Sequence, residues 1–206
     1  MHSTVSILLR LAVVGMLVFN SASVVLGQDN VDALRREWGP FSKREVEFEI
    51  SDAALLPSTL ARVAEQLGCR DYKEGIKDSP VRFIRSRGRR FAIVFCPAVV
   101  SGSHQVFDIQ NVLKPTLVQL PFLAIPSGFS ATARPGWITW EKGADAFHAE
   151  TGSDISPARI RHTYHVDRDT SNIVVVRVEF TPHGGIKEGW TTIWDAPIWS
   201  FPGMPN

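Results

Sequence analysis

The sequence predicts a mainly β domain, an α+β fold with one well-supported helix whose strands form an antiparallel meander. Three observations lead to this fold class. Short apolar or alternating segments recur along the chain, turns rich in Gly, Asp, Asn and Pro separate them, and only one segment has strong helical periodicity. Consecutive strands with short connections are typical of a sandwich, a barrel or propeller-like sheets, and the sequence does not choose among these architectures.

The clearest strand is residues 45–50, in which Val46, Phe48 and Ile50 alternate with three glutamates. Alternate residues of a strand share a face, so this pattern predicts one buried face and one solvated face. Further strands are expected at residues 81–86, 91–95, 104–110, 116–122, 137–141, 146–150, 159–167, 172–180 and 190–194. The short Gly-containing connection at 87–90 favours a hairpin between the first two of these.

A helix is expected at about residues 57–67. Pro57 suits its first turn, Gly68 suits its end, and apolar residues recur between them at helical spacing. These apolar residues are Leu60, Val63, Ala64 and Leu67. A weaker helical pattern covers about 29–37, and Gly39-Pro40 is expected to stop it.

The N-terminus has the pattern of an export signal. Arg10 precedes an apolar run at 11–19 that is too short to span a bilayer, and small residues follow at Ser21, Ser23 and Gly27. We therefore predict a cleavable signal peptide at 1–27, a single β-rich domain at 28–206, and a periplasmic or secreted location. The alternative is an uncleaved anchor, which would place Arg10 and the polar residues in or near hydrocarbon at some cost.

The mature chain is expected to be electrically neutral. The whole chain has 22 Lys and Arg against 21 Asp and Glu, and Arg10 would leave with the signal. A nucleic-acid binder needs a surplus of basic residues, so nucleic acid is not an expected partner. The basic residues between 82 and 90 are interpreted as a solvated hairpin tip. After cleavage of the signal we expect no stable membrane span.

The two cysteines of the chain, Cys69 and Cys96, are expected to form a disulfide. An exported chain folds in an oxidising compartment, where a pair of cysteines is more often bridged than left reduced. The alternative is two unpaired buried thiols. Two cysteines cannot form a structural zinc site by themselves, and we expect no metal.

Catalytic residues are hard to find in this sequence. The chain has no Gly-x-Ser-x-Gly, Ser-x-x-Lys or His-Glu-x-x-His motif and no Gly-rich phosphate loop, and we expect no cofactor. The weak catalytic candidates are His148, Glu150 and Asp145, because the first two share a strand face and the third precedes them. Solvated strands carry many such pairs, which is the alternative. His162 and His165 should lie on opposite faces and so should not share a metal.

Tryptophans are concentrated in the last third of the chain. Trp190, Trp194, Trp137 and Trp140 are weak candidates for a surface that binds sugars or an extended peptide. By strand alternation, Trp190 and Trp194 should share a face, whereas Trp137 and Trp140 should point to opposite faces. Large aromatic residues also dominate β cores, so packing is the alternative for these rings.

Several short segments, spread over most of the mature chain, carry a family resemblance. They are CRDY at 69–72, PVRFI at 80–84, RFAIVFC at 90–96, QVFD at 105–108, GWITW at 136–140, ETGSD at 150–154 and WTTIW at 190–194. The chain resembles secreted proteins of unknown function from Gram-negative bacteria, particularly alphaproteobacteria. The resemblance implies a periplasmic or secreted setting and a β-rich fold, and it brings no catalytic residue, ligand or cofactor.

The expected function is that of a non-enzymatic binding or structural module of the cell envelope. The export signal, the β-rich pattern, the neutral charge and the missing catalytic motifs all favour it over catalysis. Its partner would be a protein or a glycan of the envelope. The alternatives are a small envelope hydrolase, which would use the histidine and carboxylates named above, and a secreted enzyme inhibitor.

Overall fold

The structure, a computed structural model, describes residues 28–42, 47–98, 102–153, 156–167, 169–170, 172–182 and 189–196. The predicted signal peptide at 1–27 lies outside the described residues. The chain divides into two compact units, residues 1–33 and residues 34–206. No helix among the described residues combines the length and the apolar character needed to cross a membrane.

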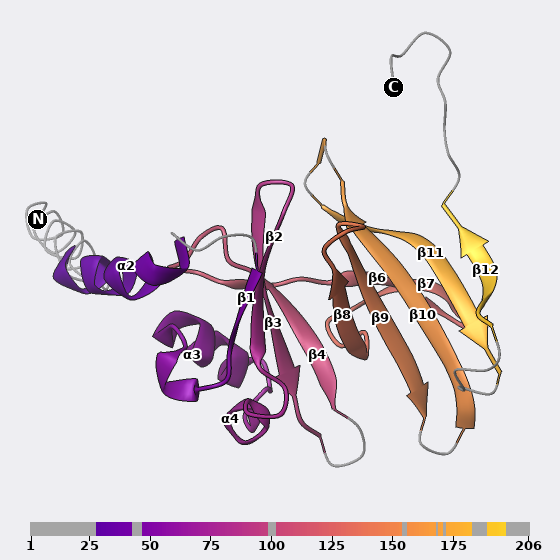
Figure 1. Cartoon of the computed structure of the whole chain (residues 1–206), viewed down its shortest axis with the longest axis horizontal. Coiled ribbons are helices and arrows are strands. Elements are labelled where there is room, and N and C mark those ends of the chain that lie inside the picture. Colours follow the sequence, from indigo (N-terminus) through magenta and orange to yellow (C-terminus); the bar gives the residue numbers. More distant parts are fainter. Residues whose placement is uncertain are drawn as a thin grey trace, which may run out of the picture. The chain divides into compact units, whose positions relative to one another are not determined.

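The fold is mainly β, as predicted, and its strands form antiparallel meanders (Figure 1). The first five-stranded sheet contains β1 (Glu47–Ile50), β2 (Val81–Ser86), β3 (Arg89–Cys96), β4 (Ser103–Asp108) and β5 (Thr116–Leu117), in that order. The second contains β8 (Trp137–Glu141), β9 (Ala146–Ser153), β10 (Ser156–Val166), β11 (Ile173–Thr181) and β12 (Thr191–Asp195). A separate hairpin is formed by β6 (Leu120–Ala124) and β7 (Gly128–Thr132).

The first sheet is buried on both faces, as β3 shows most clearly. Ala92 and Val94 belong to a core shared with the helices, whereas Phe91 and Ile93 belong to a core shared with the second sheet. A strand buried on both sides reads as a continuous apolar run, which explains the unbroken FAIVF segment at 91–95. The second core lies between the two sheets, so the arrangement is that of a β sandwich.

The predicted helix at about 57–67 is present as α3 (Ser58–Gln66), which buries Leu60 and Ala64. It ends because Gly68 adopts a φ of 86°, a conformation that a residue with a side chain rarely takes. The amides of Gly68 and Cys69 then donate to the carbonyl oxygens of Glu65 and Ala64, at 3.2 and 3.0 Å. This is a Schellman motif, and it turns the chain toward the first sheet. Two short helices lie on either side of α3, the 3-10 helix η1 (Ala53–Leu55) and α4 (Tyr72–Gly75).

The weaker helical pattern near the mature N-terminus forms a longer helix than expected, α2 (Gln28–Ser42). The prediction that Gly39-Pro40 stops it was wrong, because the helix continues through Pro40 for its last turn. Tertiary packing holds that turn in place. Trp38 is buried and its Nε1 donates to Thr59 Oγ1 at 2.8 Å, and the Phe41 ring lies 5.1 Å from that of Phe83.

The strand expected at 116–122 is two strands in different sheets. β5 pairs with β4, and β6 pairs with β7, a strand that the sequence analysis did not predict. The chain leaves the first sheet at Val118, whose amide still donates to Val106 at 2.8 Å. The residues of β7 are small or exposed, and its one large apolar side chain, Phe129, is half exposed, so its sequence carries no alternating apolar pattern.

The predicted disulfide joins Cys69 and Cys96. Both residues are buried, with exposed fractions of 1% and 3%. Cys69 follows α3 directly and Cys96 ends β3, so the bond ties the helical layer to a central strand of the first sheet.

Two buried histidines connect strands that belong to different sheets. His104 of β4 accepts a hydrogen bond at Nδ1 from the Ile138 amide of β8, at 3.0 Å. His162 of β10 accepts at Nε2 from the Leu123 amide of β6, also at 3.0 Å. Burial lowers the pKa of each imidazole to about 4, and at His104 the charge of Arg82 contributes to this shift. Both rings are therefore neutral acceptors at physiological pH, a structural role that the sequence analysis did not predict.

Candidate functional site

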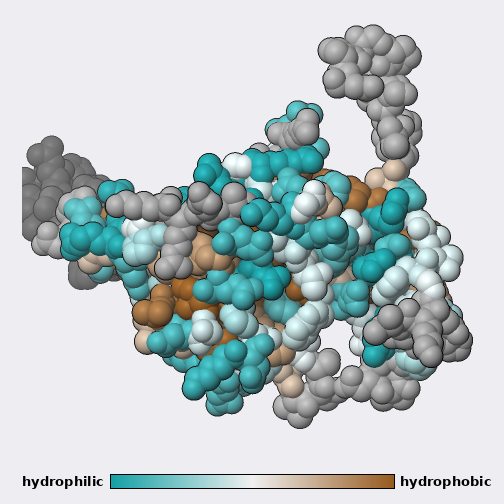
Figure 2. Space-filling view, in the orientation of Figure 1, coloured by the Kyte–Doolittle hydropathy of each residue, from teal (hydrophilic) through white to brown (hydrophobic). Residues whose placement is uncertain are grey.

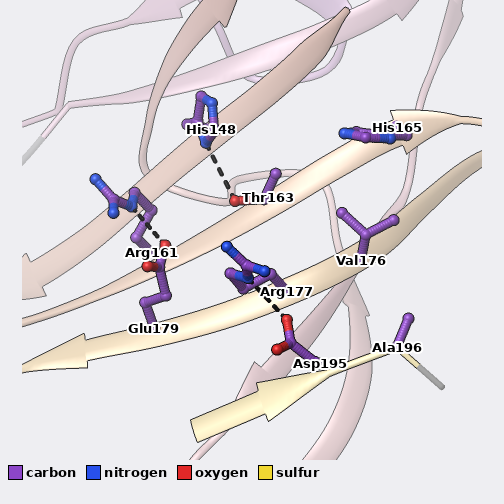
Figure 3. Close-up of a pocket in the computed structure, with 9 residues that line it drawn as sticks. All are labelled: His148, Arg161, Thr163, His165, Val176, Arg177, Glu179, Asp195 and Ala196. Atoms are coloured by element: carbon purple, nitrogen blue, oxygen red, sulfur yellow. Dashed lines mark hydrogen bonds and ion pairs between the residues drawn. The ribbon is translucent and has the colours of Figure 1, made fainter. Parts of the chain in front are cut away.

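A polar depression of about 620 Å³ lies on the outer face of the second sheet, the face that points away from the first sheet. Its lining side chains come from β9, β10, β11 and the end of β12 (Figure 3). They are His148, Arg161, Thr163, His165, Val176, Arg177, Glu179, Asp195 and Ala196. In Figure 2 the surface over the second sheet is mostly hydrophilic or neutral, and more of the visible hydrophobic surface gathers toward the helices and the first sheet.

These side chains point outward because successive residues of a strand point to opposite faces of the sheet. In β10, His162, Tyr164 and Val166 are fully buried against the core, and the residues between them, Thr163 and His165, line the depression. His162 and His165 thus lie on opposite faces, as predicted. In the sequence, polar residues alternate with Ile160, Tyr164 and Val166, and only the buried His162 interrupts the pattern. The pattern could have indicated this face, but it does not show which neighbouring strands complete the site.

Two arginine–carboxylate pairs form the floor of the depression. Arg161 Nε donates to Glu179 Oε2 at 2.9 Å, and Arg177 Nε donates to Asp195 Oδ1 at 2.7 Å. In both pairs the two residues stand directly opposite each other on neighbouring strands. The Arg161–Glu179 pair is partly buried, whereas an exposed pair such as Arg177–Asp195 contributes little to stability, about 1 kcal/mol at most. Their effect is to fix the orientation of two guanidinium groups within the depression.

His148 lies between a carboxylate and a hydroxyl. Its Nε2 is 2.9 Å from Glu141 Oε2, and its Nδ1 is 3.2 Å from Thr163 Oγ1. This row of three side chains crosses the neighbouring strands β8, β9 and β10. It resembles the order of carboxylate, imidazole and hydroxyl found in nucleophilic enzymes.

The carboxylates proposed from the sequence as partners of His148 have other partners. Glu150 shares the outer face of β9 but stands opposite Arg161, 3.9 Å from its Nη1. Asp145 lies in the turn before β9, where it pairs with Arg87 at 3.3 Å. Neither lines the depression. The carboxylate that contacts His148 comes from the neighbouring strand, and only the cross-strand register reveals it.

The four tryptophan candidates do not form one exposed row. Trp137 is half exposed and Trp140 is buried, so these two point to opposite faces as predicted. The prediction that Trp190 and Trp194 share a face was wrong. The pairing of β11 with β12 shifts register between Val178 and Glu179, and the Trp194 ring packs 5.0 Å from that of Phe129.

Trp190 is the one of these four rings that contacts a residue of the depression. The Cζ atom of Arg161 lies 4.3 Å from the centre of the Trp190 ring, within the range of a cation–π contact. The contact holds the Arg161 guanidinium from a third side, in addition to Glu179 and Glu150.

The described residues do not form a candidate metal centre. In that part of the chain, no three His, Cys, Asp or Glu side chains are grouped so that they could hold a metal ion. Comparisons of the chain with models of protein families, with curated proteins and with solved structures gave no match. The resemblance to secreted proteins of alphaproteobacteria therefore stays a prediction.

Proposed function

We propose that this protein is an exported, non-enzymatic module that binds a carbohydrate of the cell envelope in the depression on β9–β12. The observation that carries the proposal is the lining, in which seven polar side chains from four adjacent strands converge on one concavity of about 620 Å³. Concave sites with a few convergent polar groups are the usual form of small-ligand sites.

The chemistry of the lining matches sugar hydroxyls. A hydroxyl both donates and accepts, and each arginine–carboxylate pair presents donors beside acceptors. Thr163 adds a further hydroxyl at the centre of the depression, and Val176 and Ala196 supply a small apolar surface. Because the ion pairs hold the polar groups in place before a ligand arrives, binding costs less side-chain entropy.

Export is supported by two independent features. The buried disulfide is typical of proteins that fold in an oxidising compartment. The N-terminal pattern of a positive residue, an apolar run and small residues supports a signal peptide. A periplasmic or secreted location would place the depression where envelope polysaccharides are found.

Replacing Arg177 by Ala is expected to weaken carbohydrate binding at least about tenfold, because it removes a charged hydrogen-bond donor from the centre of the site. The measurement is binding of the mature protein to a glycan array, followed by calorimetry on the best ligand. Arg90→Ala is the matched control, since Arg90 lies on the first sheet and its side chain, among the described residues, hydrogen-bonds only to Gln110. Equal binding by wild type and Arg177→Ala, or no bound glycan at all, would contradict the proposal.

A hydrolase is the second candidate, favoured by the row Glu141, His148 and Thr163. The binding proposal predicts that Thr163→Val, which removes the hydroxyl and keeps the shape, leaves the hydrolysis of p-nitrophenyl acetate unchanged. If the Thr163 hydroxyl were the nucleophile of a hydrolase, this variant would instead lose hydrolytic activity by orders of magnitude. A wild-type rate that falls at least about a hundredfold in both Thr163→Val and His148→Gln would favour the hydrolase.

A further inference from the structure

We infer that the carbohydrate bound in this depression is acidic, and that its carboxylate is held by the outer, Nη ends of Arg177 and Arg161. The inference rests on the proposed function and specifies its ligand. Both guanidinium groups are held in place by protein carboxylates. Each donates through Nε to a protein carboxylate, Arg161 to Glu179 and Arg177 to Asp195.

The outer end of Arg177 is open to a ligand, whereas Nη1 of Arg161 also lies 3.9 Å from Glu150. Among the described residues, the Nη atoms of Arg177 make no hydrogen bond, and half of its side chain is exposed. A guanidinium presents its donors as a planar fork, whose geometry matches a carboxylate. The fork cannot swing freely, because Asp195 holds its Nε at 2.7 Å. Figure 3 shows the Arg177 guanidinium near the centre of the depression, with Asp195 below it.

Arg161 is held at least as firmly. Glu179, whose side chain is 13% exposed, accepts from its Nε, and the Trp190 ring covers its guanidinium. Thr163 follows Arg161 on the same face of β10 and stands opposite Arg177 on β11. The two arginines are therefore diagonal neighbours on one face, a spacing within reach of a single ligand for side chains of this length.

The charge of the surroundings limits how acidic the ligand can be. Glu179 and Asp195 neutralise the two arginines, and Glu141 and Glu150 add negative charge at the rim. A dense polyanion such as a nucleic acid would be repelled there, because it depends on a surplus of positive charge. A saccharide with one carboxylate and several hydroxyls on each sugar unit fits better, since the protein carboxylates can then accept from its hydroxyls.

The test compares trigalacturonate with the same trimer after its carboxyl groups have been reduced to alcohols. By calorimetry with the mature protein, we expect the acidic trimer to bind at least about tenfold more tightly, as a hydrogen bond to a charged group implies. Arg177→Lys should remove most of this preference, weakening the acidic trimer more than the reduced one, because lysine keeps the charge and loses the fork. Arg90→Lys on the first sheet is the matched control.

The outcomes separate this inference from the proposed function. If both trimers bind equally and Arg177→Lys changes neither, the acidic-sugar inference is overturned while carbohydrate binding stands. If neither trimer binds, the inference is overturned and the glycan array alone decides the proposed function. Tighter binding of tri-glutamate than of trigalacturonate would assign the carboxylate to a peptide and also overturn the inference.

Discussion

Replacing both Cys69 and Cys96 by Ala is expected to lower the free energy of unfolding by about 3–4 kcal/mol. The disulfide closes a loop between residues 27 positions apart, and removing the bond restores the conformational entropy of that loop to the unfolded chain. In a domain of this size, the loss corresponds to a fall in Tm of about 10 °C. It is a large share of the stability that a single domain has.

Thermal unfolding followed by circular dichroism measures this loss. The wild-type protein in the presence of a reductant serves as the control, because it should melt with the double variant and below the oxidised wild type. A non-reducing intact mass two hydrogens below the reduced mass would establish the bond chemically. A double variant whose Tm lies within about 2 °C of the oxidised wild type would show that the bond contributes little to folding.

Acidification from pH 6.5 to pH 4 is expected to remove several kcal/mol of stability through His104 and His162. The pKa of each is about 4 in the folded protein and near 6.5 when unfolded. Between these values the unfolded chain binds protons that the folded chain does not, so stability is complete above pH 6.5 and is lost as the pH falls toward 4. Complete protonation of one such imidazole costs about 3 kcal/mol.

The structural reason is a conflict between two donors. Protonation of His104 Nδ1 would place an N–H group against the Ile138 amide, and protonation of His162 Nε2 would do the same against the Leu123 amide. Each of these two hydrogen bonds joins strands from different sheets, so its loss would weaken the connection between those sheets. Buried donors without an acceptor are costly, which adds to the penalty of burying charge.

Two substitutions isolate this effect from the other groups that titrate in acid. His104→Asn and His162→Gln place a carbonyl oxygen near the ring nitrogen that accepts, and neither side chain titrates. Each variant should flatten the decline in unfolding free energy between pH 6.5 and 4, measured by urea unfolding at a series of pH values. If unfolding free energy declines as steeply in the double variant as in the wild type, the decline belongs to other groups. These would be the carboxylates or His165, because burial and the charge of Arg87 lower the pKa of His165.

The elements that the sequence predicted well are those determined by local pattern. Three elements are specified by their own sequence without reference to their neighbours. They are β1, with its alternating apolar and acidic residues, β3, with its continuous apolar run, and α3, with its periodic apolar residues. The disulfide could also be predicted, because two cysteines leave only one pairing. Where packing against another element decided the outcome, as for the last turn of α2 around Trp38, local signals were misleading.

The candidate site could be predicted only in part, because it depends on register between strands. His148 was identified from its own strand, but its carboxylate partner, Glu141, lies on the neighbouring strand. A single register shift near Trp194 reversed the predicted face of that ring. The pairing of Arg177 with Asp195 likewise joins residues from separate strands. Strand pairing is set by the whole sheet, and a one-residue shift moves a side chain to the opposite face.

The side chains of Arg177 and Asp195 are about half exposed, and they belong to the face of the second sheet that takes no part in either apolar core. Substitutions on such a face change folding stability by only about 0.5 kcal/mol. The proposed ligand site is therefore separate from the residues that stabilise the fold. Its side chains can be exchanged one at a time while the disulfide-linked scaffold stays unchanged.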